Sequence, residues 1–249
     1  MSLTKKLDYT SVKPVSAPAK SMRVFLQPFN KASFNGQNTE VIQIRIPAGK
    51  AGQYLDTSQS YLQFTLNNTS DRDMALDGCA MSIIDRFEVW ANASSFQCED
   101  LQEYGTFYNM LLDLKKDSTE RGNGDNLLLG CGGGLIVADG LSNPNRNGVI
   151  IASGASRTFC LPLVSGILAL DQFLPVGAMS GDMEIRMTLS NVNKAFVYND
   201  GAHGDPAIPA GQGSYTVTDC RYVAQMVELD ASAEQSVRSS NGGVIQISS

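Results

Sequence analysis

Few residues in this 249-residue chain have side chains suited to acid–base or metal chemistry. The single histidine, His203, lies in a stretch rich in Gly, Pro and Asp. A Ser–His–Asp triad or a histidine metal cluster therefore has only one possible centre. The favoured interpretation of His203 is an exposed loop residue. The sequence predicts no catalytic residue, no cofactor and no metal site, and it does not indicate an enzyme.

The glycine-rich stretch 130–134, GCGGG, invites comparison with a phosphate-binding loop. Such a loop carries Lys and then Ser or Thr directly after its glycines, so that the ammonium group reaches the phosphates. Leu135 and Ile136 stand there instead, and no strand–loop–helix pattern surrounds them. A flexible or tightly turned loop is the better interpretation.

Paired carboxylates occur twice, at Glu99 with Asp100 and at Asp182 with Glu184. Two carboxylates act as general acid and base only where their environments separate their pKa values. Glu99 and Asp100 are expected at the beginning of a helix, whose dipole favours negative charge there. Asp182 and Glu184 are expected on the solvated face of a strand. Both pairs therefore have a structural explanation.

Alternating apolar and polar residues predict the strands of an antiparallel sheet. In 41–46, Ile42, Ile44 and Ile46 alternate with polar or smaller residues, and 61–66 shows the same period of two. The 23 glycines favour many turns, while 43% apolar and 18% charged residues are typical of a globular domain. Because strands do not alternate with helices, a parallel sheet is not expected.

Two short helical insertions interrupt this strand pattern. A helix is predicted over 99–116, where apolar residues recur at spacings of three and four, and a shorter helical turn over 166–173, ended by Pro175. Between them, 117–148 is rich in Gly, Asn and Asp, which predicts an excursion from the surface.

The predicted fold class is all-β, an antiparallel two-sheet jelly-roll sandwich with short helical insertions. Three segments are expected along the chain: a flexible basic arm over 1–21, a jelly-roll domain over 22–230, and a polar tail or linker over 231–249. The five cysteines are widely spaced and include no C-x-x-C motif, as in proteins made in a reducing compartment.

The net charge of −6 argues against a globular surface that binds nucleic acid. The N-terminal arm has the opposite character, with one acid, Asp8, among five basic residues: Lys5, Lys6, Lys13, Lys20 and Arg23. Such an arm could contact phosphates or a membrane surface, or it could be a solvated tail.

The order of these pieces resembles the first jelly roll of major capsid proteins in the double-jelly-roll lineage of icosahedral DNA viruses. The resemblance covers roughly residues 22–230. It rests on an apolar strand step, a short helical turn closing on Leu-Pro, and a following strand: Phe159, Pro162, Leu163, Phe173, Leu174, Pro175, Ile185 and Leu189. A further likeness lies in the strand 87–92, although Ala93 replaces the glycine of the family's turn.

The resemblance implies a structural capsid protein that self-assembles into an icosahedral shell in the virion and is made in the interior of a host cell. Its partners would be copies of itself and other capsid proteins, with the basic arm facing a membrane or the genome. The family normally has a second jelly roll. This chain is therefore a fragment, or works with a second roll in another chain, or is a single-jelly-roll relative. A trimer is expected if a second roll is supplied, and a pentamer or hexamer if not.

The predicted turn over 166–173 gathers an apolar patch that either covers the protein's own core or docks a neighbouring subunit: Ile167, Leu168, Leu170 and Phe173. The alternative function is a non-enzymatic β-sandwich binding module, either lectin-like or a viral receptor-binding spike. Its ligand site would lie on loops around 198–215. A cupin-like enzyme needs clustered histidines, which a single histidine does not provide.

Overall fold

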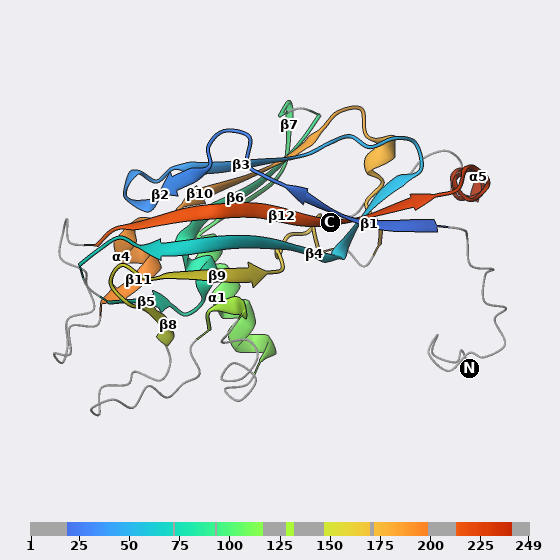
Figure 1. Ribbon diagram of the computed structural model, residues 1–249. Helices are drawn as coiled ribbons and strands as arrows, with labels where there is room; N and C mark the ends of the chain where they lie inside the picture. Colours follow the sequence, from blue (N-terminus) through green and yellow to red (C-terminus); the bar gives the residue numbers. More distant parts are fainter. Residues whose placement is uncertain are drawn as a thin grey trace, which may run out of the picture.

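Antiparallel strands in two stacked layers form the body of the protein, as the computed structural model shows (Figure 1). The structure describes residues 19–71, 73–92, 94–116, 128–131, 147–169, 172–198 and 213–240. Every strand pairing in this part of the chain is antiparallel, which confirms the predicted fold class.

The first sheet has the order β1-β12-β4-β9, with a short strand β2 also paired to β12. Its strands are β1 (Ala19–Leu26), β2 (Ser33–Asn35), β4 (Gln53–Asn68), β9 (Ser156–Leu161) and β12 (Tyr215–Leu229). The long strands β4 and β12 form the middle of this sheet, although they are about 150 residues apart in the sequence, as the pairing of Tyr215 with Asn68 shows. The sheet is therefore built from long-range contacts.

The second sheet has the order β3-β10-β6-β7, and a third, smaller sheet has the order β11-β5-β8. The strands of the second sheet are β3 (Val41–Ile46), β6 (Ile84–Ala91), β7 (Phe96–Gln102) and β10 (Met183–Leu189). Those of the third are β5 (Met74–Asp77), β8 (Asn147–Ile151) and β11 (Phe196–Tyr198). In Figure 1 the second sheet lies above the first.

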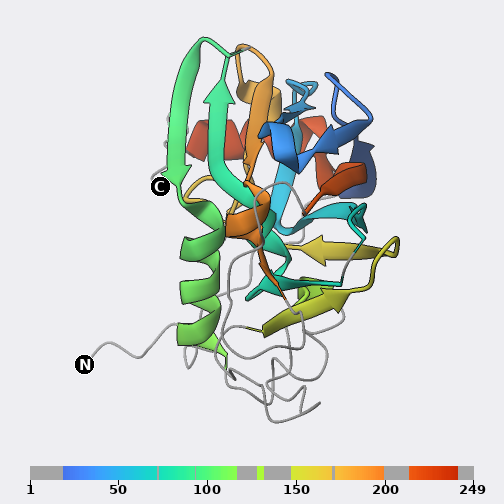
Figure 2. The ribbon, with the colours of Figure 1, turned by 90° about the vertical axis from the view of Figure 1, so that its left-hand side faces the viewer.

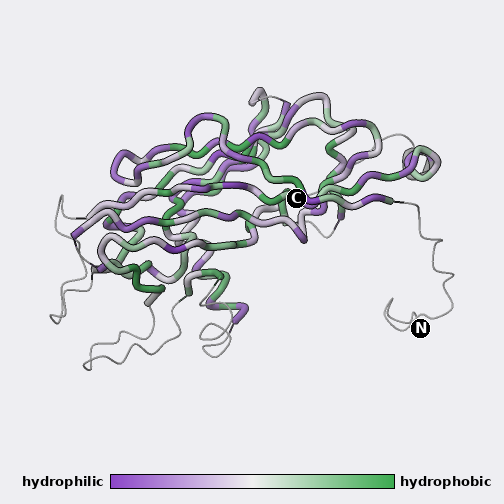
Figure 3. Tube along the Cα trace, in the orientation of Figure 1, coloured by the Kyte–Doolittle hydropathy of each residue, from purple (hydrophilic) through white to green (hydrophobic). Residues whose placement is uncertain are grey.

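The core lies between the two larger sheets and is made by the residues whose alternation predicted the strands. Ile42, Ile44 and Ile46 are at most 1% exposed, and Phe64 is buried from the opposite layer. The Phe64 ring packs against Phe159 with ring centroids 5.9 Å apart. Hydrophobic and hydrophilic segments alternate along the strands in Figure 3, because successive side chains point to opposite faces.

Helical segments are short and lie at the ends and sides of the sandwich. They are η1 (Gly36–Asn38), η2 (Ala80–Ile83), α1 (Tyr104–Lys115), η3 (Val176–Ala178), α4 (Val192–Ala195) and α5 (Ala231–Ser240). The predicted helix over 99–116 exists, but it begins at Tyr104. Residues 96–102 form β7 instead, and Glu103 makes the turn between strand and helix with a φ of 54°.

Helix α1 is fixed to the sandwich by a close approach and by aromatic packing. An atom added at the Cβ position of Gly105 would lie 2.7 Å from the Ser82 Cα in η2, so only glycine allows this spacing. The Tyr104 ring stacks on Phe87 of β6 with centroids 4.9 Å apart. The position of α1 beside the sandwich is seen in Figure 2.

The two segments predicted at the chain ends each overlap an element of the structure. Strand β1 begins at Ala19, inside the predicted arm 1–21, and residues 1–18 lie outside the described part. At the other end, the segment predicted as a tail or linker begins with helix α5, and 241–249 are not described.

Candidate assembly surfaces

The prediction that Glu99 and Asp100 begin a helix is wrong, because both lie in strand β7. The Glu99 carboxylate accepts hydrogen bonds from the Gly166 backbone N–H at 2.7 Å and from the Ser165 hydroxyl. Asp100 accepts two hydrogen bonds from the Arg86 guanidinium, at 2.8 and 2.7 Å. The Arg86 guanidinium lowers the pKa of Asp100 below its usual value. Glu99 therefore anchors the start of the turn at 166–169, and Asp100 anchors the Arg86 side chain of the neighbouring strand.

The predicted helical turn over 166–173 is reduced to one hydrogen-bonded turn at 166–169. Ser165 begins it, because its backbone oxygen accepts from the Ala169 N–H at 3.0 Å. The Ser165 hydroxyl oxygen also accepts from the N–H groups of Ile167 and Leu168, at 3.2 and 3.0 Å. The turn is therefore capped by a serine whose hydroxyl is fixed in turn by Glu99.

The four residues predicted to share an apolar patch on this turn have different surroundings. Leu168 is 2% exposed and belongs to the core, and Ile167 packs against the core from outside. Phe173 is 50% exposed, and Leu170 lies outside the described residues. Leu168 therefore covers the protein's own core, while Phe173 is left for contact with solvent or a neighbour.

The expectation that Asp182 and Glu184 lie on a solvated face is wrong for Glu184, which is 3% exposed. Its carboxylate accepts a hydrogen bond from the Arg186 Nε at 2.7 Å and another from the Ser94 hydroxyl. Asp182 accepts from the Ala48 backbone N–H at 2.8 Å, in the loop before β4. The two acids therefore have separate structural partners.

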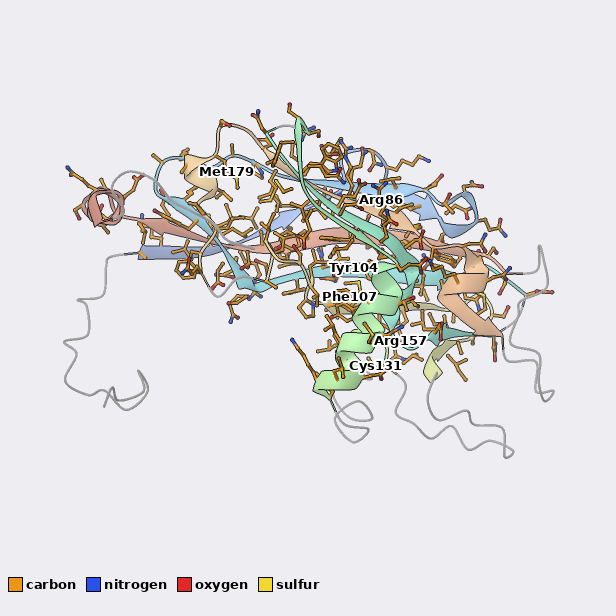
Figure 4. The ribbon with its side chains drawn as sticks, turned by 180° about the vertical axis from the view of Figure 1, so that it is seen from behind. Arg86, Tyr104, Phe107, Cys131, Arg157 and Met179 are labelled. Atoms are coloured by element: carbon orange, nitrogen blue, oxygen red, sulfur yellow. The ribbon has the colours of Figure 1, made fainter. Side chains whose placement is uncertain are left out.

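Charged and aromatic residues continue across the outer face of the second sheet, between β10, β6 and β7. Glu88 pairs across the strands with Arg186 and is 3.2 Å from the Arg86 Nη2; Arg86 is labelled in Figure 4. The Arg186 guanidinium lies 4.7 Å from the centre of the Trp90 ring, so Trp90 belongs to this outer face. The result is a polar face whose charges are largely paired within the molecule.

Helix α1 has a second apolar face beside the one that covers the core. Its core-facing side carries Tyr104, Tyr108 and Leu112. The other face, which we call the outer stripe, consists of Phe107, Met110, Leu111 and Leu114, spaced i, i+3, i+4 and i+7. Met110 is 55% exposed and Leu114 78% exposed. The periodicity that predicted the helix already included Leu111 of this stripe, but it did not separate the buried face from the exposed one.

The basic arm is described only at its inner end. Lys20 and Arg23 lie in β1, which pairs with β12 along one edge of the first sheet. The Arg23 Nε donates to the Gln225 side chain at 3.4 Å. Lys5, Lys6 and Lys13 lie outside the described residues. The role of the arm therefore stays a prediction.

The first two residues of the glycine-rich stretch, Gly130 and Cys131, pack against the core. Cys131 is 2% exposed, and the Gly130 carbonyl accepts a hydrogen bond from the Val149 N–H at 3.0 Å. Gly130 has a φ of 70° and lies against Phe159, which leaves no room for a side chain. Residues 132–134 are not described.

A surface pocket of about 290 Å³ lies where the connection after β1 meets the bulge of β12. It is lined by Gln27, Pro28, Phe29, Asn30, Lys31, Ala32, Asp219, Cys220 and Arg221. Lys31 is already paired with Glu40 at 2.7 Å, and Arg221 donates to Gln63 at 3.1 Å. The two cations of the pocket are thus engaged in contacts with the protein itself.

No group of three or more His, Cys, Asp or Glu in the described ranges is placed to hold a metal ion. No helix in that part of the chain is long and apolar enough to cross a membrane. His203 and the loop 199–212, where the binding-module alternative places its ligand site, lie outside it.

Comparisons with known proteins give matches among solved structures alone. No protein-family model matches the chain, and no curated protein matches it. The PBCV-1 protein VP54, fitted into a reconstruction of the virophage Sputnik, aligns with a TM-score of 0.57 and 12% identity, covering 92% of this chain and 46% of its own. The quasi-atomic model of the PBCV-1 capsid gives a TM-score of 0.55 and 13% identity, with the same coverage.

The Faustovirus major capsid protein aligns with a TM-score of 0.54 and 9% identity, covering 94% of this chain and 58% of its own. The chain thus spans about half the length of the capsid proteins that it matches. At such low identity the likeness concerns the course of the backbone, and it extends over nearly all of this chain. The protein therefore has the jelly-roll fold that is also found in the capsid proteins of PBCV-1 and Faustovirus.

Proposed function

We propose that this chain is a structural subunit of an icosahedral viral capsid, located in the virion and without a catalytic role. The observation that carries the proposal is the alignment of 92–94% of the chain with capsid proteins of PBCV-1 and Faustovirus. Fold alone does not determine function, since one fold serves many functions. The proposal therefore also draws on the surfaces of this molecule.

Those surfaces are suited to contacts with other proteins. The outer stripe of α1 leaves Met110 and Leu114 more than half exposed, and Phe173 is 50% exposed; exposed apolar patches often mark protein interaction sites. The outer face of the second sheet offers ion pairs such as Arg86–Asp100, whose charges can be shared with a neighbour. Apolar contacts supply affinity in such interfaces, and charges set orientation and partner choice.

The partners that we propose are copies of this chain and other capsid proteins. A trimer is expected if a second jelly roll is supplied by a further segment or another chain, and a pentamer or hexamer otherwise. In either arrangement the basic residues Lys5, Lys6 and Lys13 would face the interior, toward a membrane or the genome. Chain lengths of the matched capsid proteins, about twice this one, support a role for a second module.

Sedimentation velocity and mass photometry of the purified chain test this proposal. The measurements run at micromolar concentration across several salt concentrations, with and without divalent ions, because subunit contacts between charged faces weaken with salt. Discrete oligomers of defined copy number are expected. A protein that stays monomeric under every condition would count against a shell subunit. A glycan array provides the complementary test, since strong binding would favour the lectin-like alternative.

A further inference from the structure

The outer stripe of α1 is an apolar helix face whose outermost members, Met110 and Leu114, are left exposed by the described part of the protein. Leu114 is 78% exposed and Met110 55% exposed, while Phe107 packs partly against the core (labelled in Figure 4). Helices on the surface of a folded protein normally turn charged or polar residues outward. Here the helix is apolar on two faces, of which only one is buried.

The stripe is complementary to itself when two helices run antiparallel. Its members are spaced i, i+3, i+4 and i+7, the pattern by which one helix packs into the grooves of another. A two-fold axis passing between residues 110 and 111 would place Phe107 opposite Leu114 of the second copy, and Met110 opposite Leu111. Each contact then occurs twice, as two-fold interfaces require.

Charges at the two ends of α1 favour the same antiparallel arrangement. Glu103 caps its N-terminal end, where Lys194 of α4 pairs with both Glu103 and Asp85 of β6, so two acids stand against one lysine. Its C-terminal end carries Lys115 and Lys116 with Asp113, two lysines against one acid. An antiparallel partner brings each acidic end next to a basic end, whereas a parallel partner would bring like charges together.

We propose that α1 forms a two-fold interface in which the outer stripe packs against the outer stripe of a second copy of this chain. The inference rests on the proposed function and makes it more specific, because it names the partner and the contact. A single apolar helix pair is a small interface, so it would act together with other contacts in a larger assembly.

The first experiment compares the double substitution Met110→Glu and Leu114→Glu with Thr106→Glu, measured by sedimentation equilibrium. Thr106 is an exposed polar residue of the same helix, outside the stripe, and serves as the matched control. Two carboxylates buried against Leu111 and Phe107 of the second copy should raise the dissociation constant for subunit association at least about tenfold. Thr106→Glu should leave it unchanged. Far-ultraviolet circular dichroism checks that all three proteins fold.

The second experiment tests proximity directly. Met110→Cys, in a Cys98→Ser background that removes the exposed native thiol, is treated with a short bismaleimide; Thr106→Cys in the same background is the control. A covalent dimer is expected from Met110→Cys at protein concentrations that support association. Equal cross-linking of the two variants would overturn the inference.

Three results of the first experiment would also overturn it. Oligomers of unchanged mass in the double variant would show that the subunits meet elsewhere, and the capsid proposal would stand without this contact. A lower unfolding midpoint in a variant whose oligomers are unchanged would show that the chain's own residues cover the stripe. A wild-type protein that never associates would contradict both the inference and the proposed function.

Discussion

At the scale of single residues, Gly105 shows how a helix can need a residue that weakens helices. Glycine inside a helix costs about 1 kcal/mol relative to alanine because it loses more backbone freedom. Here a Cβ atom would lie 2.7 Å from the Ser82 Cα and 2.8 Å from the Met81 carbonyl oxygen. Both are backbone atoms, which cannot move aside as a flexible side chain can.

Gly105→Ala is therefore expected to destabilise the protein, although it raises the helix propensity of α1. Overpacking in a rigid interior typically costs about 1–3 kcal/mol, which exceeds the propensity gain. Urea denaturation gives the free energy of unfolding, with Thr106→Ala as the control at an exposed neighbouring position. A Gly105→Ala protein more stable than the wild type would show that the backbone of η2 can shift to accommodate the added methyl group.

Glu184 depends on Arg186 for its charge to be tolerated under the protein surface. Arg186→Met keeps an unbranched apolar stem but leaves the buried carboxylate without its cation, so we expect a loss of about 3 kcal/mol in the free energy of unfolding. The double change Glu184→Gln with Arg186→Met should recover most of that loss. Fluorescence of Trp90, the single tryptophan, should respond to Arg186→Met, since the guanidinium lies over its ring. If the losses in unfolding free energy caused by the two substitutions simply added, the dependence of Glu184 on Arg186 would be refuted.

Tyr222 makes stability depend on pH in the alkaline range. Burial raises the pKa of Tyr222 to about 12 from an ordinary value of 10. The folded state therefore holds this proton more tightly, so the stabilisation is complete below pH 10 and is lost as the pH rises through 12. In Tyr222→Phe, the fall in unfolding free energy between these pH values should be shallower, by up to about 1.4 kcal/mol per pH unit. Denaturant titrations at stepped pH measure this, and identical slopes would refute it.

At the scale of elements, the turn at 166–169 is held by contacts with strand β7. Ser165 is 5% exposed, caps two backbone N–H groups and donates to Glu99. We expect Ser165→Ala to cost about 1–2 kcal/mol, the usual effect of losing a helical cap. Ser156→Ala, at an exposed position of β9, is the control in chemical denaturation. Equal stability of the two variants would show that the cap contributes nothing.

Strands were predictable from the sequence where one face is buried and the other is wet. Ile42, Ile44 and Ile46 alternate in the sequence and are all buried in the structure. The boundary between β7 and α1 was not predictable in this way. Glu99 takes its role from Ser165 and Gly166, far along the chain, and a single sequence does not reveal such a pairing.

The candidate surfaces were predictable to a smaller degree than the fold. Apolar residues in a short helix can be buried or left exposed, and spacing alone does not separate Leu112, which is 9% exposed, from Leu114, which is 78% exposed. The spacing of the predicted patch on 166–173 was equally uninformative, because Leu168 is buried in the core and Phe173 is half exposed. Tertiary packing decides these outcomes.

At the scale of the whole molecule, two sheets form a block with different outer surfaces. Its central strands, β4 and β12, pair over a long register, which makes a stiff body. One outer face presents paired charges around Glu88 and Arg186, whereas α1, which lies beside the sandwich in Figure 2, presents an apolar stripe. Such a block can make several different contacts with its neighbours without changing its own fold.

A cryo-electron microscopy reconstruction of the assemblies formed by the purified chain, with any second module it requires, is the sharpest test of whether this protein builds a shell. We expect closed oligomers with rotational symmetry, in which each subunit's density fits the stacked sheets without rearrangement and the same set of contacts recurs around every subunit. Particles without symmetry, or subunits whose contacts differ at random from one copy to the next, would contradict a shell-building role.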